Sequence, residues 1–394
     1  MVLTVEEVVV VVATRYLLLF CVCMCGWAKL AQATILPEER SDAMYHRYDG
    51  GGVVIDGPSV LVRKNFKDSL SVSGNYYVDN VSSASIDVLT SGASEYSEKR
   101  TEYSVGVDYL YNKSIIGAGF TSSDESDYTA ETFYFNVSQD FFGDLTNVTF
   151  GYSLGQDEVF QNGNSDFAEE IDRNNFRLDV SQIVSANMIM GFNYELISDE
   201  GYLNNPYRSY RYLSNPLDPE AGYQLAQEVY PNTRTSDAAS LRLKYYLPWG
   251  AALGGSYRYF TDDWGIDAHT LQLAYTHVLY GSWFVDVKYR YYVQTQADFY
   301  SDLFLVSSQD EKDYRARDKE LSDFNNHTFS AYLSYQRPLS YRSFDSAALS
   351  LQWDHIWFSY DNFTDLTDQA ALAGEESLYE FDADVFKIVI TLWY

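Results

Sequence analysis

Cysteine is almost absent from this chain of 394 residues. Its three cysteines, Cys21, Cys23 and Cys25, all lie within the first 33 residues. Everything after that point therefore lacks a disulfide framework, a thiolate zinc site and a thiol nucleophile. Histidine is scarce too, with five residues in all, so the sequence offers few of the side chains that most often serve as general bases.

Basic residues are also few, since 27 Lys and Arg stand against 56 Asp and Glu, for a formal net charge of −29. A chain this acidic repels phosphates, so we exclude nucleic acid as a partner. No run of about 18 apolar residues follows residue 33, so we expect no transmembrane helix there. With 46% hydrophobic residues the chain is still too apolar to be disordered.

The N-terminus has the pattern of an export signal. Arg15 precedes an apolar run over residues 16–25, and Ala31-Gln32-Ala33 is a small-x-small cleavage site, so we assign residues 1–33 to a signal peptide. Glu6 and Glu7 stand where a basic region belongs, which indicates a start codon placed too far upstream. An uncleaved membrane helix is the alternative.

Aromatic residues, in contrast, are abundant: the chain has 36 Tyr and 23 Phe, which favour strands and membrane interfaces. The last nine residues alternate, so that an extended chain places one apolar set on a single face. That set is Phe386, Ile388, Ile390, Leu392 and Tyr394. An apolar terminal strand of this kind is typical of the strand that closes an outer-membrane barrel against lipid.

Similar alternation recurs upstream. In residues 282–295, Trp283, Val285 and Val287 share one face, while Asp286 and Lys288 share the other. We predict fourteen strands, over residues 69–79, 100–111, 114–122, 128–139, 145–156, 172–183, 187–198, 236–248, 250–262, 267–280, 282–295, 324–337, 345–360 and 378–394. Tight turns and long polar loops alternate between them, the longest loops being 199–235 and 296–323.

This pattern predicts an all-β fold, a transmembrane up-and-down antiparallel β-barrel of about 14 strands (12–16 possible). The long loops would be extracellular and the short turns periplasmic, in the outer membrane of a Gram-negative bacterium. The alternatives are a soluble sandwich, which would need a dry two-sided core, and a propeller, which would show a blade repeat of about 40 residues. The charged second face and the lack of a repeat disfavour both.

Residues 34–68 are less regular, because Gly50-Gly51-Gly52 and Gly57-Pro58 interrupt them. We expect this segment to lie in the lumen or at the periplasmic rim, ahead of a barrel over residues 69–394. The alternative is an additional strand that, with a partner, would raise the count to sixteen.

One set of charged residues points inward near mid-height by strand parity. Its bases are Arg177, Arg242, Lys244, Arg258, Lys288 and Arg290, and its acids are Asp108, Asp179, Glu195, Asp286 and Asp354. A charged constriction with a transverse field would select solutes or bind an anion. The competing interpretation is a salt-bridged network that fills and closes the lumen.

The sequence has no recognisable catalytic or metal-binding motif. A lipid-facing His–Ser pair of a phospholipase would need Ser two residues after His, and none of the five histidines has one. The acidic groups around Asp124 and Asp361 lack the spacing of a calcium loop, although a dense acidic surface could bridge to lipopolysaccharide through divalent cations. We therefore expect no catalytic residue, no metal and no cofactor.

Several unbroken strings resemble one bacterial family, domain of unknown function 3570, whose members are interpreted as outer-membrane barrels. The strings are Tyr48-Asp-Gly-Gly-Gly-Val53, Asp56-Gly-Pro-Ser-Val-Leu-Val-Arg-Lys64, Gly201-Tyr-Leu-Asn-Asn-Pro-Tyr-Arg208, Tyr230-Pro-Asn-Thr-Arg-Thr-Ser236, Tyr257-Arg-Tyr-Phe-Thr-Asp-Asp-Trp-Gly-Ile-Asp-Ala-His-Thr270, Ala297-Asp-Phe-Tyr-Ser-Asp-Leu-Phe304 and Ala316-Arg-Asp-Lys-Glu-Leu-Ser322. The resemblance implies a barrel and a setting beside a small lipoprotein. It implies no catalytic or binding residue.

From the sequence we expect a channel or transport-type barrel with a charged lumen. The alternatives are a non-conducting structural or assembly barrel, plugged by residues 34–68 or by a small lipoprotein, and an outer-membrane enzyme. Expected partners are outer-membrane lipid, lipopolysaccharide and the barrel-assembly machinery. Loop 199–235 holds four of the eight prolines and many tyrosines, so we expect it to fold with loop 296–323 into a lid at the lumen mouth. The alternative is a surface loop varied by phage and immune pressure.

Overall fold

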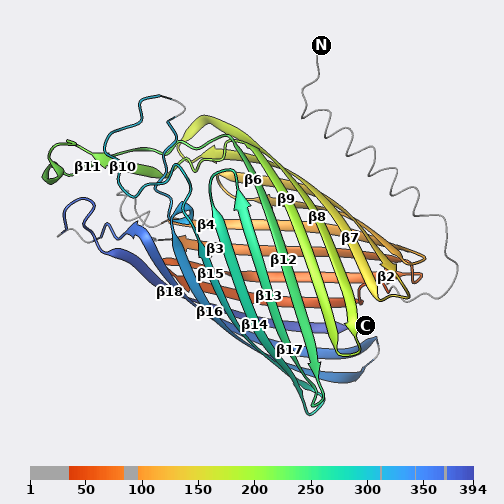
Figure 1. Cartoon of the computed structure of the whole chain (residues 1–394). Helices are drawn as coiled ribbons and strands as arrows, with labels where there is room; N and C mark the ends of the chain where they lie inside the picture. Colours follow the sequence, from red (N-terminus) through yellow and green to blue (C-terminus); the bar gives the residue numbers. More distant parts are fainter. Residues whose placement is uncertain (1–34, 84–95, 311–312, 342, 368–370) are drawn as a thin grey trace.

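Sixteen antiparallel strands close into one barrel (Figure 1). The computed structural model describes residues 35–83, 96–310, 313–341, 343–367 and 371–394. The predicted signal peptide, residues 1–33, lies outside the described residues. Within them, no helix has the length and apolar character needed to cross a membrane.

The barrel strands follow one another along the chain, with one insertion. They are β1 (Arg40–Gly50), β2 (Val53–Phe66), β3 (Leu70–Ser83), β4 (Tyr96–Tyr111), β5 (Ser114–Asp124), β6 (Tyr128–Phe141), β7 (Thr146–Gln161), β8 (Asn164–Ser185), β9 (Met188–Gly201), β12 (Thr233–Leu247), β13 (Ala251–Asp262), β14 (Asp267–Leu279), β15 (Trp283–Gln294), β16 (Phe324–Tyr341), β17 (Phe344–Thr364) and β18 (Leu378–Trp393). Between β9 and β12, β10 (Ser209–Leu213) and β11 (Tyr223–Gln227) form a separate hairpin.

The strand count corrects two predictions. All fourteen predicted segments are strands, but the barrel has sixteen, because β1 and β2 also belong to its wall. β1 pairs with β18 on one side, from Arg40↔Trp393 to Gly50↔Ala383, and with β2 on the other. The predicted position of residues 34–68 in the lumen or at the periplasmic rim is therefore wrong for these two strands. Because β1 and β2 form part of the wall, they do not plug the lumen.

The glycines that obscured β1 and β2 have local structural reasons. Gly51 and Gly52 form the two-residue hairpin between these strands with φ of 58° and 77°, a conformation that glycine adopts at little cost. At Gly57 a Cβ would lie 1.8 Å from the carbonyl oxygen of Val78, so only glycine fits. The β2–β3 register skips Gly57 and Pro58, as expected where proline has no N–H for the ladder.

The outer surface of the barrel is apolar. Phe386, Ile388 and Ile390 on β18 are each about half exposed, and so are Leu271 and Leu273 on β14. Their neighbours in sequence are polar or partly buried and point the other way, since side chains alternate along a strand. A closed sheet with a continuous apolar exterior has no edge and no water-facing outer surface, which is the architecture of a membrane-spanning barrel.

The two ends of the barrel differ. Among the described residues, one end has only short turns, such as Asn112-Lys113 between β4 and β5 and Tyr280–Ser282 between β14 and β15, and the chain ends there at Tyr394 (Figure 1). The other end carries the long connections, 202–232, 295–323 and 365–377. The β10–β11 hairpin lies beyond the strand ends on that side, at the upper left of Figure 1.

Candidate functional site: the lumen and its covered mouth

Side chains that bridge non-adjacent strands identify the lumen face. Arg63 on β2 reaches Asp108 on β4 at 2.8 Å across β3, and Arg242 on β12 reaches Asp179 on β8 at 3.2 Å across β9. Only the concave side of a closed sheet brings side chains two strands apart together. The strand neighbours of these residues, such as Val107 and Leu241, are exposed apolar residues of the outer face.

The structure places all eleven predicted constriction residues on this inner face by the same alternation, and it joins most of them in ion pairs. Arg177 and Arg242 both contact Asp179, at 2.5 and 3.2 Å. Arg258 lies 3.6 Å from Glu195 on β9. Within β15, Lys288 lies 2.9 Å from Asp286.

Four of the predicted residues are not joined to the others. Asp108 pairs with Arg63, which lies in the segment predicted to lie outside the barrel wall. Asp354 accepts hydrogen bonds from Gln352 on its own strand. Within the part of the chain that the structure describes, Lys244 and Arg290 have no carboxylate within ion-pair distance. Both therefore carry uncompensated positive charge in the lumen.

One further lumen cluster was missed from the sequence. Arg173 on β8 contacts Asp157 on β7 at 2.7 Å and Asp199 on β9 at 3.3 Å, and its guanidinium donates to the Tyr128 hydroxyl at 3.3 Å. Alternation along β8 was a sufficient signal for Arg173. Phe176 and Leu178 lie on the outer face, so odd-numbered residues of this strand face the lumen. The predicted set covers mid-height positions alone, whereas this cluster lies closer to the long loops.

Charge is separated around the lumen wall. On β1–β9 the inward positions are mainly acidic: Asp42, Asp79, Glu98, Glu102, Asp108, Asp140, Asp157, Asp179, Glu195 and Asp199, against Arg40, Arg63, Arg100, Arg173 and Arg177. On β12–β18 the balance reverses: Arg234, Arg242, Lys244, Arg258, Lys288, Arg290 and Lys387, against Asp262, Asp286 and Asp354. The two walls face each other, so the lumen carries a field directed from one wall to the other.

The long connections pack together into what we call the loop body: the described residues of 202–232, 295–323 and 365–377. Backbone hydrogen bonds join the first two connections, with Val229 and Arg315 exchanging a pair at 3.0 and 2.8 Å and Leu213 donating to Phe304 at 2.9 Å. Arg208 forms an ion pair with Asp318. The predicted pairing of loop 199–235 with the charges of loop 296–323 is therefore present.

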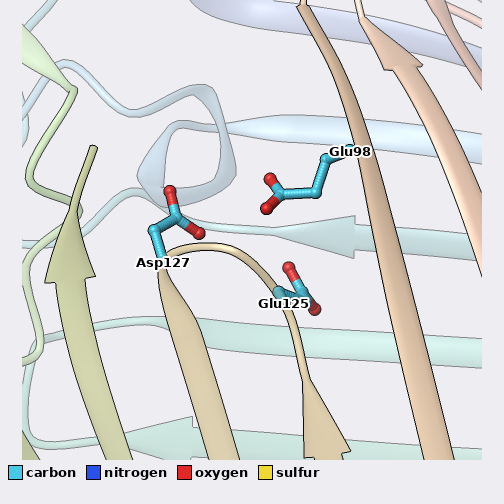
Figure 2. Close-up of side chains that lie close together, drawn as sticks. All are labelled: Glu98, Glu125 and Asp127. Carbon is cyan, nitrogen blue, oxygen red and sulfur yellow. The ribbon is translucent and has the colours of Figure 1, made fainter. Parts of the chain in front are cut away.

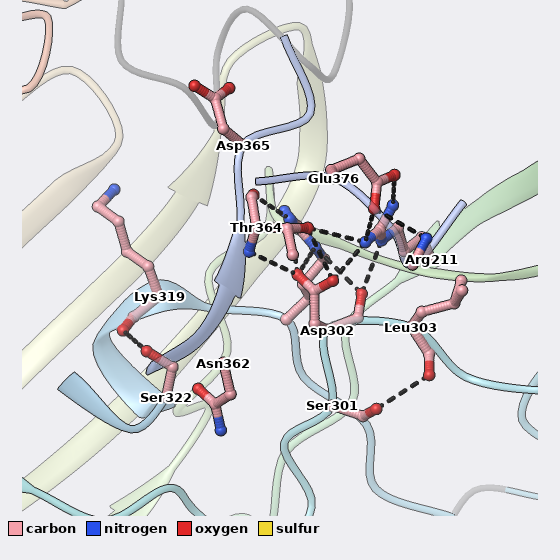
Figure 3. Close-up of polar contacts among 12 residues, drawn as sticks. Arg211, Ser301, Asp302, Leu303, Lys319, Ser322, Asn362, Thr364, Asp365 and Glu376 are labelled. Carbon is pink, nitrogen blue, oxygen red and sulfur yellow. Dashed lines mark hydrogen bonds and ion pairs between the residues drawn. The ribbon is translucent and has the colours of Figure 1, made fainter. Parts of the chain in front are cut away.

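A buried polar network fastens the third connection to the other two (Figure 3). Arg211, which is fully buried, forms an ion pair with Asp302 and another with Glu376 at 2.5 Å, and it donates to the Thr364 hydroxyl at 2.9 Å. Arg317 lies 2.8 Å from the other oxygen of Asp302. One guanidinium thus connects three loops and the end of β17.

The same charges control ionisation of the acids. Burial raises the pKa of Asp302, but the charges of Arg317 and Arg211 outweigh that effect and hold the pKa below its ordinary value. Burial likewise raises the pKa of Glu376, and the hydrogen bond from Arg211 reverses the effect, so that its pKa is also lowered. Both carboxylates are ionised at neutral pH.

Beside this network the loop body shares a hydrophobic core with the strand ends. Ala297 and Ala316 of the loop body are fully buried in it, Tyr360 and Phe363 join it from β17, and Trp264 joins it from the β13–β14 turn. The Arg317 guanidinium stacks over Phe363 at 4.2 Å. Connections with a packed core and a buried ion network form a folded unit, which agrees with the compact lid predicted from the prolines and tyrosines.

A cavity of about 1660 Å³ lies between the loop body and the strand ends. Its walls come from both sides of the barrel: Glu125 and Arg173 line one side, Arg234 and Arg258 line the other, and Tyr230 closes it from the loop body. The cavity is large enough for a solute of several hundred daltons with water around it.

Three carboxylates mark the acidic edge of the cavity. Glu98 on β4 and Glu125 and Asp127 on the β5–β6 turn have oxygens within 4.8 Å of one another (Figure 2). Burial, and then repulsion by Glu98, raises the pKa of Glu125. Within the described residues nothing beyond the carboxylates themselves marks a metal site, so we treat them as part of the electrostatics of the mouth.

Comparison with known proteins gives one family match. The model described as "Protein of unknown function (DUF3570)" matches residues 89–179 and 169–340, which together span more than half of the chain. No curated protein matches the sequence.

Solved structures with a similar fold are bacterial outer-membrane proteins. A bacterial polysaccharide outer membrane secretin shares 8% identity, with 91% of this chain and 100% of that chain covered and a TM-score of 0.49. OmpT of Vibrio cholerae shares 12%, covering 91% and 100%, at 0.42. OpdK of Pseudomonas aeruginosa shares 10%, covering 91% and 99%, at 0.41. Identities of 12% or less and TM-scores below 0.5 give no ground for transferring their activities.

The barrel itself fixes the location. A closed antiparallel sheet of sixteen strands with an apolar exterior and a charged interior is stable only with lipid outside and water inside. The protein is an outer-membrane β-barrel of a Gram-negative bacterium.

Proposed function

The chain belongs to the family of proteins of unknown function DUF3570, and we propose that it is a channel that passes small polar solutes across the outer membrane. The observation that carries the proposal is the separation of charge around the lumen wall. A structural barrel needs only to fill its interior, and paired charges on every strand would do so. Opposed acidic and basic walls instead orient and select a solute that carries charge or a dipole.

In this proposal the loop end faces the outside of the cell and the turn end faces the periplasm. Short turns and both chain ends on the periplasmic side are the usual arrangement of such barrels. Outward-facing acids at the loop end, such as Asp237, Asp267 and Asp384, would then lie at the lipopolysaccharide headgroups and bind them through divalent cations. The alternating strand β18 would be the segment that the barrel-assembly machinery engages.

The loop body is the gate of the proposed channel. It has a packed core and a fully buried arginine, so it narrows the mouth as a folded unit, and the cavity beneath it is the vestibule. A solute would enter beside the loop body, cross the vestibule and pass between the charged walls.

Excision of residues 204–230 tests the gate. The deletion removes the β10–β11 hairpin and Arg211 while leaving every barrel strand in place. We expect a larger single-channel conductance, or new sensitivity of cells to bulky antibiotics, with the barrel still folded by its heat-dependent mobility on gels. An unchanged conductance in a folded barrel would refute the gate.

A second candidate is a non-conducting barrel closed by the loop body or by a small lipoprotein, with a structural or assembly role. The hydrophobic core at the mouth favours it, because Phe363, Ala297 and Ala316 are fully buried where an open pore would be wet. Absence of ion conductance, both from the full chain and from the 204–230 deletion, would decide for this candidate.

We propose no enzymatic role. Most carboxylates of the lumen are held in ion pairs or hydrogen bonds on the wall, and the scarce histidines mostly lie on the outer face, as His269, His327 and His355 do. Hydrolysis of phospholipid by the purified protein would contradict this assignment.

A further inference from the structure

Three arginines on the basic wall are stacked on aromatic rings below the loop body. Arg234 lies over Trp264 at 4.6 Å, Arg258 over Phe260 at 5.6 Å and Arg290 over Tyr292 at 5.4 Å. Stacking on a ring fixes the plane of a guanidinium and leaves its N–H edge free to donate. These three residues therefore form an ordered row rather than a set of mobile chains.

Their charges are neutralised to different degrees. Arg234 makes a close ion pair with Asp262, at 2.6 Å, and the Asp262 side chain is fully buried. Arg258 has only a distant partner, Glu195 at 3.6 Å. Arg290 has no carboxylate within ion-pair distance among the described residues, so positive charge is in surplus at the Arg258–Arg290 end of the row.

The neighbours paired with these two arginines on the adjacent strands do not compensate that surplus. In the register, Arg258 pairs with Thr270 and Arg290 with Gln272 on β14, and the partner of Arg290 on β16 is Thr328. All three neighbours are uncharged. The two arginines are two strands apart and offset by two residues in the register, because Thr270 pairs with both Arg258 and Tyr292. Their Cα atoms are therefore roughly 12 Å apart, and their charges repel each other.

Two like charges held at this spacing by uncharged neighbours are the arrangement that an anion between them stabilises. Arg258 and Tyr292 line the vestibule directly, together with Phe260. Through these residues the site borders the vestibule, on the path of the proposed channel, and Arg290 lies next to Tyr292 on β15.

The opposite edge of the vestibule limits the kind of anion. Glu98, Glu125 and Asp127 face the same cavity, and Glu195 partly neutralises Arg258, so the surplus of positive charge is small and is matched by a singly charged anion rather than a doubly charged one. A planar, singly charged group that fits the fork of a guanidinium is a carboxylate.

We propose that Arg258, Arg290 and Tyr292 form a binding site for small carboxylates on the lumen wall, at the floor of the vestibule. The proposal rests on the channel function, and it names the class of solute that the channel selects. The carboxylate accepts from the two guanidinium groups, while its hydrocarbon part lies against Tyr292 and Phe260.

Binding of propionate to the purified full-length protein, measured by isothermal titration calorimetry, tests the site independently of conduction. Propionamide has nearly the same shape without the charge, and inorganic phosphate supplies a multivalent anion. We expect propionate to bind, propionamide not to bind, and phosphate to bind more weakly than propionate. Arg290→Gln should weaken propionate binding roughly tenfold or more, since it removes a charge-assisted donor, and Arg290→Lys should recover part of the loss.

Arg63→Gln is the matched control. Arg63 also faces the lumen, but it lies on the acidic wall and is paired there with Asp108. This variant should leave the propionate affinity unchanged. Equal loss in both variants, or equal binding of propionate and propionamide, overturns the proposal. If Arg290→Gln fails to fold, Arg258→Gln replaces it with the same expected loss.

Conductance separates this inference from the channel function. Propionate should reduce the single-channel current of the wild-type protein and not that of Arg290→Gln. A barrel that conducts but neither binds propionate nor responds to it retains the channel and refutes the site. A barrel that binds propionate without conducting refutes the channel and retains the site.

Discussion

Replacing Arg211 with methionine should open the loop body without unfolding the barrel. Arg211 is fully buried and holds Glu376, whose side chain is only 5% exposed, and Asp302 at the junction of three loops. In the variant Asp302 keeps Arg317 at 2.8 Å, but Glu376 loses its arginine. Removing one partner of a buried ion pair costs about 3–5 kcal/mol, because the remaining charge stays buried.

We expect the lower end of that range, about 3 kcal/mol, because Arg317 still compensates one of the two carboxylates. At about 1.4 kcal/mol per factor of ten, the open state of the loop body should become about a hundredfold more populated. Hydrogen–deuterium exchange measures this directly. Amides of residues 202–232 and 295–310 should lose protection, while those of β3 to β8 should not change.

Arg47→Met is the control, since Arg47 is exposed on the barrel rim and its partner Asp49 is more than half exposed. Such a pair contributes about 0–1 kcal/mol, so exchange in the loop body should stay as in the wild type. Wild-type protection of residues 202–232 in Arg211→Met would show that the network does not hold the loops, and the description of the loop body as one folded unit would be wrong.

Four other outcomes are expected. The pKa values of Asp302 and Glu376 are lowered below their ordinary values of 3.8 and 4.5. Their contribution to the stability of the loop body is therefore present at neutral pH and is lost as pH falls through these lowered values. Hydrogen–deuterium exchange in the loops should be the same at pH 7 and pH 5.5 and should rise below about pH 4. Gly57→Ala should reduce the amount of folded barrel, since its Cβ would lie 1.8 Å from the Val78 carbonyl oxygen. Gly74→Ala should not, because its Cβ would have nothing nearer than 3.9 Å. Equal yields of folded barrel for the two variants, measured by heat-dependent gel mobility, would contradict the wall position of β2. A cysteine at Asn204 should react with an impermeant maleimide on intact cells and one at Asn112 should not, and labelling at Asn112 would reverse the proposed orientation. Deleting Tyr394 should lower the outer-membrane level of the protein, because its hydroxyl donates to the Arg63 carbonyl oxygen at 3.0 Å across the closure, and unchanged levels by immunoblot would contradict this.

Alternation along the strands was enough to predict fourteen of the sixteen strands, because each has one apolar and one polar face. It failed at β1 and β2, because the glycine and proline residues there are typical of turns. Gly51-Gly52 is indeed a turn, but a hairpin within the wall. Gly57 is required by close approach of Val78 rather than by a chain reversal. A glycine pair flanked by two alternating stretches was the signal that could have identified this hairpin.

Strand parity also placed the lumen charges on the inner face, since a one-residue alternation needs no knowledge of neighbours. Which charges meet could not be predicted in the same way. Arg242 and Asp179 are 63 residues apart and lie two strands apart in the closed barrel. The buried pair of Arg211 with Glu376 joins residues 165 positions apart in sequence, from two loops. Pairings of this kind depend on how the barrel closes, which local patterns do not contain.

The central claim, that the barrel is a channel, is tested most directly by single-channel recording of the purified full-length protein in planar lipid bilayers with KCl on both sides. The account predicts discrete, stable current steps that become larger when residues 204–230 are removed. A folded protein that inserts into the bilayer and gives no current, with or without those residues, would contradict it.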